Sequence, residues 1–207
     1  SNEDNFILLS RYDGKTKRSV VELVDIKKKK ILHKWIPDIN KINKETKLNK
    51  KIIDLDKNFS ENRYQIIHPL LLNDGSIIFH GMYTPLVKVD ICSNLIWTID
   101  DIFHHSIEKD ENDFIWIPSS NVDEDGIAVD YLTKINNEGS ILLKVSLKKL
   151  LNDINYPYLN IYAGSDPFHL NDIQPIKKNV FEKGNYILSM RNISSIAIYD
   201  EKQNKIK

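Results

Sequence analysis

Cysteine and long apolar runs are nearly absent from this sequence. The one cysteine in 207 residues, Cys92, excludes an intrachain disulfide framework and a cysteine-based zinc site, and we interpret it as a small buried side chain. No stretch approaches the roughly 18 consecutive apolar residues of a membrane helix, and the first residues do not resemble a signal peptide. The 29 basic and 29 acidic residues cancel. We therefore expect no membrane segment in this chain and no nucleic-acid partner.

The sequence consists instead of short apolar segments rich in Ile, Val, Tyr and Trp, separated by turns rich in Asp, Asn and Gly. This pattern is typical of β-strands. Three turns, Asn73–Gly75, Asn137–Gly139 and Lys183–Asn185, contain Gly or Asn, which adopt the positive φ of hairpin turns. The sequence therefore predicts an all-β protein.

The segments also repeat along the chain. Residues 4–11 align without a gap with residues 184–191, and residues 68–79 align with residues 105–116. A second motif is an alternating strand that ends in Asp or Asn and is followed by a polar turn and a return strand. Its four acids or amides are Asp25, Asp90, Asn136 and Asp200.

Repeats of about 40–50 residues are typical of β-propeller blades with four strands each. We expect about four blades, at residues 4–37, 64–100, 101–146 and 166–207, with insertions at 38–63 and 144–168. The first insertion is expected to be a surface loop, whereas Leu147–Asn152 has helical spacing. Residues 1–207 would be a single propeller domain or a fragment of one. A fragment has open sheet edges, so we expect self-association or a missing remainder of the propeller.

Three histidines precede strands of the repeats, where side chains would line a central channel: His68, His105 and His169. Imidazole can act as a nucleophile, an acid or a base near neutral pH. His169 and Asn171 are two residues apart and share a face of an extended segment. Arg191 lies on the following strand, and its planar guanidinium suits a sulfate, phosphate or carboxylate. Together these residues describe an oxyanion site.

Structural interpretations of the same residues remain open. A repeated histidine can satisfy a backbone carbonyl at the start of a blade, and Arg191 can form a salt bridge on the surface or between blades. Arg11 occupies the place that matches Arg191 in the first repeat. His33 and His80 lie within predicted strands and are expected to be structural or exposed. His104 competes with its neighbour for the aligned position.

Metal binding has little support. The sequence has no His-x-His or His-Glu-x-x-His pattern, and the acidic run Asp123–Gly126 lacks the later ligands of a calcium loop. We expect no metal site.

Several segments resemble the bacterial arylsulfotransferase family, and the resemblance runs over most of the chain from Phe6 onward. They are Tyr64–Pro69, Pro85–Asp90 with Ile96-Trp97, His104–Glu108, and above all Asp166–Asp172 followed by Ile187–Arg191. The resemblance implies a six-bladed β-propeller in the periplasm or otherwise outside the cytoplasm. It implies transfer of a sulfuryl group from a phenolic sulfate ester to a phenol, through a sulfated histidine. It also implies no cofactor and no need for the nucleotide donor PAPS.

By this resemblance, His169 and Asn171 match the family's His-x-Asn pair, Arg191 its sulfate-holding Arg, and His105 a further channel His. The expected catalytic residues are thus His105, His169 and Arg191, and the expected substrate-binding residues are His68 and Asn171. The sequence departs from the family in two respects. No His follows His169, where the family has its covalent nucleophile, and 207 residues are too few for six blades.

Three functions remain open from the sequence. The first is a sulfuryl-transfer enzyme, at least in a longer form of the protein. The second is a non-catalytic propeller that binds an anionic ligand or a partner protein, because propellers host both kinds of function. The third is a structural repeat module in which the three histidines do not converge.

Overall fold

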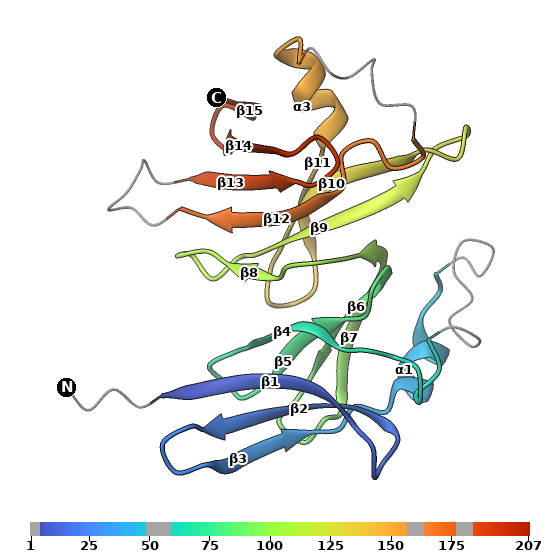
Figure 1. Cartoon of the computed structure of the whole chain (residues 1–207), viewed down its shortest axis with the longest axis vertical. Helices are drawn as coiled ribbons and strands as arrows, with labels where there is room; N and C mark the ends of the chain where they lie inside the picture. The colour runs from blue at the N-terminus through green and yellow to red at the C-terminus, as the bar shows by residue number, and fades with distance from the viewer. Residues whose placement is uncertain (1–4, 49–58, 157–163, 177–183) are drawn as a thin grey trace. The chain divides into compact units, whose positions relative to one another are not determined.

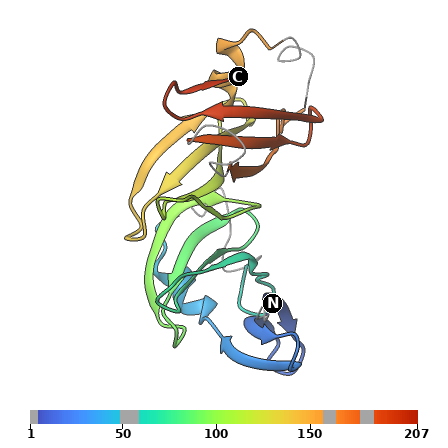
Figure 2. The same cartoon turned by 90° about the vertical axis from the view of Figure 1, so that its left-hand side faces the viewer.

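The computed structural model describes residues 5–48, 59–156, 164–176 and 184–207. These residues form antiparallel strands and two short helices, so the predicted all-β class is confirmed. The chain divides into two compact units, Ser1–Asp101 and Ile102–Lys207, and within each unit the strands of a sheet follow one another in chain order (Figures 1 and 2). In its described part, the chain contains no helix with the length and hydropathy needed to cross a membrane.

The first unit contains two groups of strands and one helix. The first group is β1 (Phe6–Asp13), β2 (Arg18–Asp25) and β3 (Lys30–Trp35), followed by α1 (Ile39–Glu45). The second group is β4 (Ile67–Leu71), β5 (Ile77–His80), β6 (Thr84–Val89) and β7 (Leu95–Phe103), whose last two residues belong to the second unit. Their shared core includes Val21, Trp35, Ile39 and Phe79.

The helix α1 lies where a surface loop was expected, so that prediction is wrong for Ile39–Glu45. The side chain of Asp38 accepts a hydrogen bond from the backbone N–H of Lys41 and caps the first turn. Ile39 and Ile42, one helical turn apart, are both buried. A cap and one apolar face are sufficient for a short helix that packs on a core.

The second unit contains two further groups of strands. The first is β8 (Glu108–Lys109), β9 (Ile115–Val122), β10 (Ala128–Ile135) and β11 (Ile141–Ser146), with the end of β7 paired to β9. The second is β12 (Leu170–Pro175), β13 (Asn185–Met190), β14 (Ser195–Asp200) and β15 (Lys205–Ile206). The helix α3 (Leu147–Asp153) confirms the helical spacing seen in the sequence. The core of the unit joins Trp116, Tyr186 and Tyr199 to the apolar face of α3.

The repeated turn motif is confirmed at all four places. It joins β2 to β3, β6 to β7, β10 to β11 and β14 to β15. In each turn the side-chain oxygen accepts a backbone N–H three or four residues later, at 2.9, 2.8, 2.7 and 3.1 Å for Asp25, Asp90, Asn136 and Asp200 respectively. An Asp or Asn that holds its own turn in this way fixes where the return strand begins.

The gap-free alignment of the first and last repeats is wrong by one residue. Phe6 and Asn185 face the turn carboxylates of β2 and β14 in their ladders, which gives an offset of 185 − 6 = 179 residues. The sequence alignment used an offset of 184 − 4 = 180. Arg11 therefore corresponds to the residue before Arg191, and the two arginines are not equivalent.

The alignment of the two middle repeats is shifted in the same way. The turns that follow β4 and β8 close at Leu72 and Asp110, which are 110 − 72 = 38 residues apart, whereas His68 and His105 are 105 − 68 = 37 apart. The difference arises because His105 lies five positions before Asp110, whereas His68 lies only four positions before Leu72. Cys92 lies in the turn between β6 and β7 and is exposed, so its interpretation as a buried side chain is wrong.

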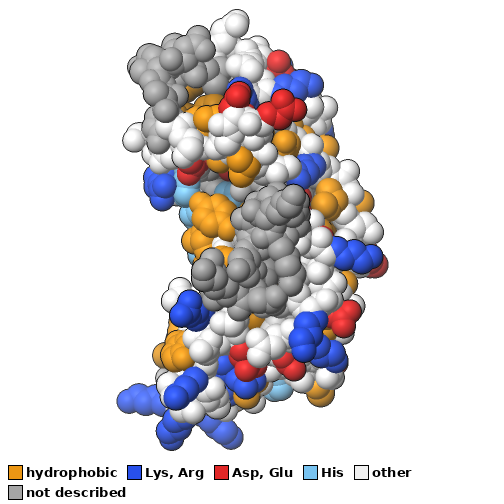
Figure 3. Space-filling view, turned by 90° about the vertical axis from the view of Figure 1, so that its right-hand side faces the viewer, with side chains coloured by type: hydrophobic (Ala, Val, Ile, Leu, Met, Phe, Trp, Pro, Cys, Tyr) orange, Lys and Arg blue, Asp and Glu red, His pale blue; other side chains and the backbone are white. Residues whose placement is uncertain are grey.

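Basic and acidic side chains both occur on the face of the molecule drawn in Figure 3, in keeping with the balanced composition.

Candidate active site

Three histidines form a row in the second unit. The Nδ1 atoms of His104 and His105 are 2.8 Å apart, and the Nε2 atoms of His105 and His169 are 3.2 Å apart. The rings of His105 and His169 meet edge to face, with centroids 4.8 Å apart. The structure therefore brings together two of the predicted site histidines, together with His104, which competed with His105 for the aligned position.

The predicted histidines share an uncommon backbone conformation. His68, His105 and His169 have φ of 41°, 63° and 55°. Residues other than Gly rarely adopt positive φ, and such strain is concentrated at functional sites. His169 directly precedes a bulge between Leu170 and Asp172, and the bulge redirects the chain at the point where the imidazole leaves it.

The far end of the row is formed by an acid and an arginine. The Nδ1 of His169 donates to Asp166, and the Nη2 of Arg191 lies 3.2 Å from the same nitrogen. The backbone N–H of Arg191 also donates to the carbonyl of His169, at 3.1 Å. Arg191 is exposed and its Nε donates to Asn192, at 3.1 Å, so its guanidinium lies beside a buried imidazole while remaining accessible to a ligand.

The near end of the row is formed by Asp130 on β10. Its Oδ1 lies 3.5 Å from the Nε2 of His104, and its Oδ2 accepts the backbone N–H of Leu170 at 3.0 Å. Next to the row, the Oγ of Ser106 donates to Asp172 at 2.5 Å. These bonds link the segment before β8 to the start of β12, so two distant parts of the sequence hold the row in place.

Asn171 lies in the bulge of β12, between His169 and Asp172. Its Oδ1 is buried and has no hydrogen-bond partner among the described residues. A buried acceptor without a partner is costly. This amide therefore suits a ligand that brings a donor, or one that the turned amide can contact through its N–H groups.

The family model of the arylsulfotransferases (ASST) matches residues 68–207. The chain belongs to the arylsulfotransferase family. The matched segment contains every residue proposed for the site from the sequence. A comparison with curated proteins found no match.

His68 lies on β4 of this arylsulfotransferase-family chain, in the first unit, and its side chain is exposed. Its substrate-binding role remains a prediction. His80 is fully buried and its Nδ1 lies 2.5 Å from the carbonyl of Gly81, while His33 bonds the carbonyl of Ile91 at 2.8 Å. The structural interpretation of these two histidines is therefore confirmed.

Sequence reasoning did not single out Asp130 or Asp166 as partners of the histidines. Asp166 could have been recognised from the sequence, because it begins the Asp166–Asp172 motif and lies three residues before His169. Asp130 gave no local signal, since it is an acid inside an alternating strand, and only the packing of β10 beside β12 brings it to the row.

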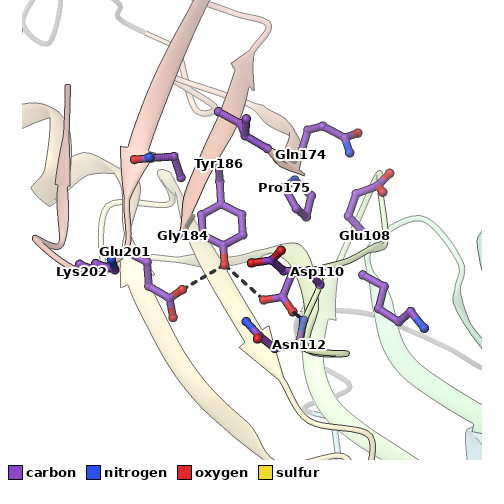
Figure 4. A pocket seen from close by; sticks show the side chains of 13 residues that line it. Glu108, Asp110, Asn112, Gln174, Pro175, Gly184, Tyr186, Glu201 and Lys202 are labelled. Carbon is purple, nitrogen blue, oxygen red and sulfur yellow. Dashed lines mark hydrogen bonds between the residues drawn. The ribbon is translucent and has the colours of Figure 1, made fainter. Parts of the chain in front are cut away.

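A separate pocket of about 530 Å³ lies elsewhere in the second unit and contains no histidine. Figure 4 shows Tyr186 projecting between Asp110 and Glu201, which its hydroxyl approaches at 3.2 and 3.0 Å. Burial, and then the negative charge of Glu201, raises the pKa of Tyr186. Burial, followed by the charge of Asp172, raises the pKa of Glu108 at the pocket rim.

Within the described ranges, no group of three or more His, Cys, Asp or Glu side chains has an arrangement that could hold a metal ion. The histidine row is compatible with this result because its nitrogens face one another and two carboxylates.

Proposed function

We propose that this protein transfers a sulfuryl group from a phenolic sulfate ester to a phenol, with a histidine as the intermediate carrier and without PAPS. One observation carries the proposal: two imidazole Nε2 atoms, of His105 and His169, converge at 3.2 Å beside the guanidinium of Arg191. Imidazolium and guanidinium groups fixed in this way can neutralise the sulfuryl oxygens as negative charge develops on them.

The transfer would take two displacements. In the first, a histidine nitrogen attacks sulfur, the N–S bond forms, and the S–O bond to the aryl group breaks to release a phenolate. In the second, an acceptor phenol gives its proton to a base as its oxygen attacks sulfur, and the N–S bond breaks. His105, His169 and Arg191 would hold the sulfuryl oxygens in both steps, and Asn171 would contact the substrate.

The proposed architecture is a β-propeller. Three features support it: the groups of consecutive antiparallel strands, the turn motif repeated four times, and the start of β8 and β12 next to the converging histidines. We also propose a location outside the cytoplasm, on the family resemblance, which fractionation of the source cells would test.

A second candidate is a non-catalytic protein that binds a sulfated or carboxylated ligand at the same row. The observation in its favour is that no histidine follows His169 in the 207 residues, where the family resemblance places the nucleophile.

The test is release of a coloured phenol from a synthetic aryl sulfate, with and without an acceptor phenol. We expect acceptor-dependent release that is lost in His169→Ala and Arg191→Ala, with both variants folded by circular dichroism. His33→Ala is the matched control, because His33 lies in the first unit and bonds a backbone carbonyl.

Mass spectrometry after incubation with donor alone should find a sulfated histidine. Saturable sulfate binding without turnover or sulfation would favour the second candidate. Full turnover in both site variants would overturn the assignment of the site.

A further inference from the structure

Asp130 occupies a place that neither the resemblance nor the family match assigns. It is 3% exposed, and its two oxygens face the two histidine-bearing segments. One oxygen accepts the N–H of Leu170, the residue after His169, and the other lies 3.5 Å from the Nε2 of His104, the residue before His105. A single carboxylate therefore connects both sides of the proposed site.

The position of His104 extends this connection to the reacting end of the row. His104 is 1% exposed, and its Nδ1 lies 2.8 Å from the Nδ1 of His105. A histidine nitrogen orients its neighbour only if the pair shares one proton. The protonation of His104 therefore decides which nitrogen of His105 carries hydrogen, and with it what the Nε2 of His105 presents to a ligand.

The protons in the row are linked from ring to ring. The contacts run from Asp130 to His104, from His104 to His105, and from His105 to His169, whose Nδ1 lies beside Asp166 and Arg191. An ionised carboxylate can only accept and a guanidinium can only donate. A proton on the Nε2 of His104 leaves its Nδ1 to accept from the Nδ1 of His105, whose Nε2 then accepts from the Nε2 of His169.

We propose that Asp130 is a positioning residue of this site, which keeps a proton on the Nε2 of His104 and thereby sets which nitrogens of His105 and His169 carry hydrogen. This inference rests on the proposed function, because His105 and His169 are the histidines proposed to hold the sulfuryl oxygens. Within the described part of the chain, Asp166, Arg191 and, through Ser106, Asp172 also face the row.

A carboxylate suits this place because both of its neighbours are donors: the N–H of Leu170 and the Nε2–H of His104. In Asp130→Asn the amide oxygen can still accept from Leu170, but the NH2 group then faces His104 and requires a bare Nε2 there. Asp130→Asn therefore keeps the bond to Leu170 and removes the proton from the Nε2 of His104. Asp130→Ala removes the bond and the acceptor of that proton together.

The experiment measures three properties of the wild type, Asp130→Asn and Asp130→Ala. Nitrogen NMR of 15N-histidine protein shows which ring nitrogens carry hydrogen, calorimetry measures binding of inorganic sulfate, and phenol release measures kcat and KM. In wild type we expect protonated Nε2 on His104. In Asp130→Asn we expect bare Nε2 there, sulfate affinity and kcat/KM lowered about tenfold or more, and little change in the thermal midpoint.

Asp110→Asn is the matched control, because Asp110 is another buried carboxylate of the same unit that accepts from Trp116 at 3.1 Å and from two turn amides. It should lower the thermal midpoint and leave the His104 nitrogen signals unchanged.

A bare Nε2 on His104 in the wild type, or wild-type sulfate affinity in Asp130→Asn, would overturn the inference. Absence of turnover in the wild type would count against the proposed function alone, since the NMR and sulfate measurements do not depend on it.

Discussion

Each unit contains a cluster of polar side chains, and the two clusters are compensated in different ways. In the first unit, Arg11 donates to both oxygens of the buried Glu22 at 2.9 and 2.6 Å, and Lys34 lies 2.8 Å from Asp13. Every charge has a partner of opposite sign. In the second unit, imidazoles face imidazoles, and the nearest guanidinium, of Arg191, is exposed.

The pKa shifts in the first cluster follow from these ion pairs. The hydrogen bond from Arg11 lowers the pKa of Glu22, and the bond from Lys34, followed by the backbone N–H of Lys15, lowers the pKa of Asp13 to about 2. A cluster that stabilises its own ionised groups in this way is complete without a ligand. The second cluster also contains two carboxylates, Asp130 and Asp166, but its arginine is exposed, and the buried oxygen of Asn171 has no hydrogen-bond partner among the described residues. These two features distinguish the candidate binding site from the structural cluster.

The largest expected effect comes from comparing the two arginines. Arg191→Ala should lower kcat/KM for aryl sulfate by about 100-fold or more, as loss of an oxyanion-stabilising group does, with little loss of stability, because Arg191 is exposed. Arg11→Ala should leave turnover unchanged and lower stability. Turnover assays and urea unfolding of both variants would show that one loses turnover and the other loses stability. Equal loss of turnover in both would remove the distinction between the clusters.

The next effect concerns the stability of the compensated cluster. Glu22→Ala leaves Arg11 and Lys34 without their buried partner, but these side chains are 36% and 28% exposed and water screens them. We expect a loss of about 2 kcal/mol in the free energy of unfolding, below the range for a fully buried pair.

Glu61→Ala breaks the more exposed pair with Arg18, at 2.8 Å, and serves as the control in the same unit. It should cost less than about 1 kcal/mol. Equal losses in Glu22→Ala and Glu61→Ala, measured by urea unfolding, would contradict the importance of burial.

The acid sensitivity of the protein should follow from the same cluster. Because the pKa of Asp13 is lowered to about 2 in the folded protein, its contribution to stability is present above the ordinary Asp value of about 4. It is lost as the pH falls through about 2. Asp13→Asn should therefore flatten the fall in unfolding midpoint between pH 4 and pH 2. An unchanged slope would show that other carboxylates control acid unfolding.

The smallest effects are expected at the turn motif, which occurs in both units. Asp25→Ala and Asn136→Ala each remove one acceptor of a backbone N–H, at 2.9 and 2.7 Å. Each should cost about 1 kcal/mol, measured by thermal unfolding. A loss in only one of them would mean that the repeated turn does not act alike in the two units.

Much of this architecture could be predicted from the sequence because its signals are local. The strand pattern, the turn motif at Asp25, Asp90, Asn136 and Asp200, and the helix at Leu147 each depend on neighbouring residues. The exact register could not be predicted, because the number of residues between a histidine and its turn differs by one between the two middle repeats.

The candidate site could be predicted in part, because some of its residues lie in recognisable sequence segments. His105, His169 and Arg191 lie in segments with a family resemblance, and the structure brings them together. Asp130 approaches them only because β10 packs beside β12. No spacing along the chain encodes that approach. The residues that support a site are thus harder to find from sequence than the residues that line it.

The turn motif also affects how such a protein can lengthen. Each hairpin contains the side chain that closes its own turn, so a duplicated segment of DNA would encode strands together with the means to set their register. Segments inserted between hairpins, such as residues 38–63 and 144–168, leave those closing bonds intact. A chain built in this way can gain repeats, and vary what lies between them, while the geometry of each hairpin is inherited unchanged.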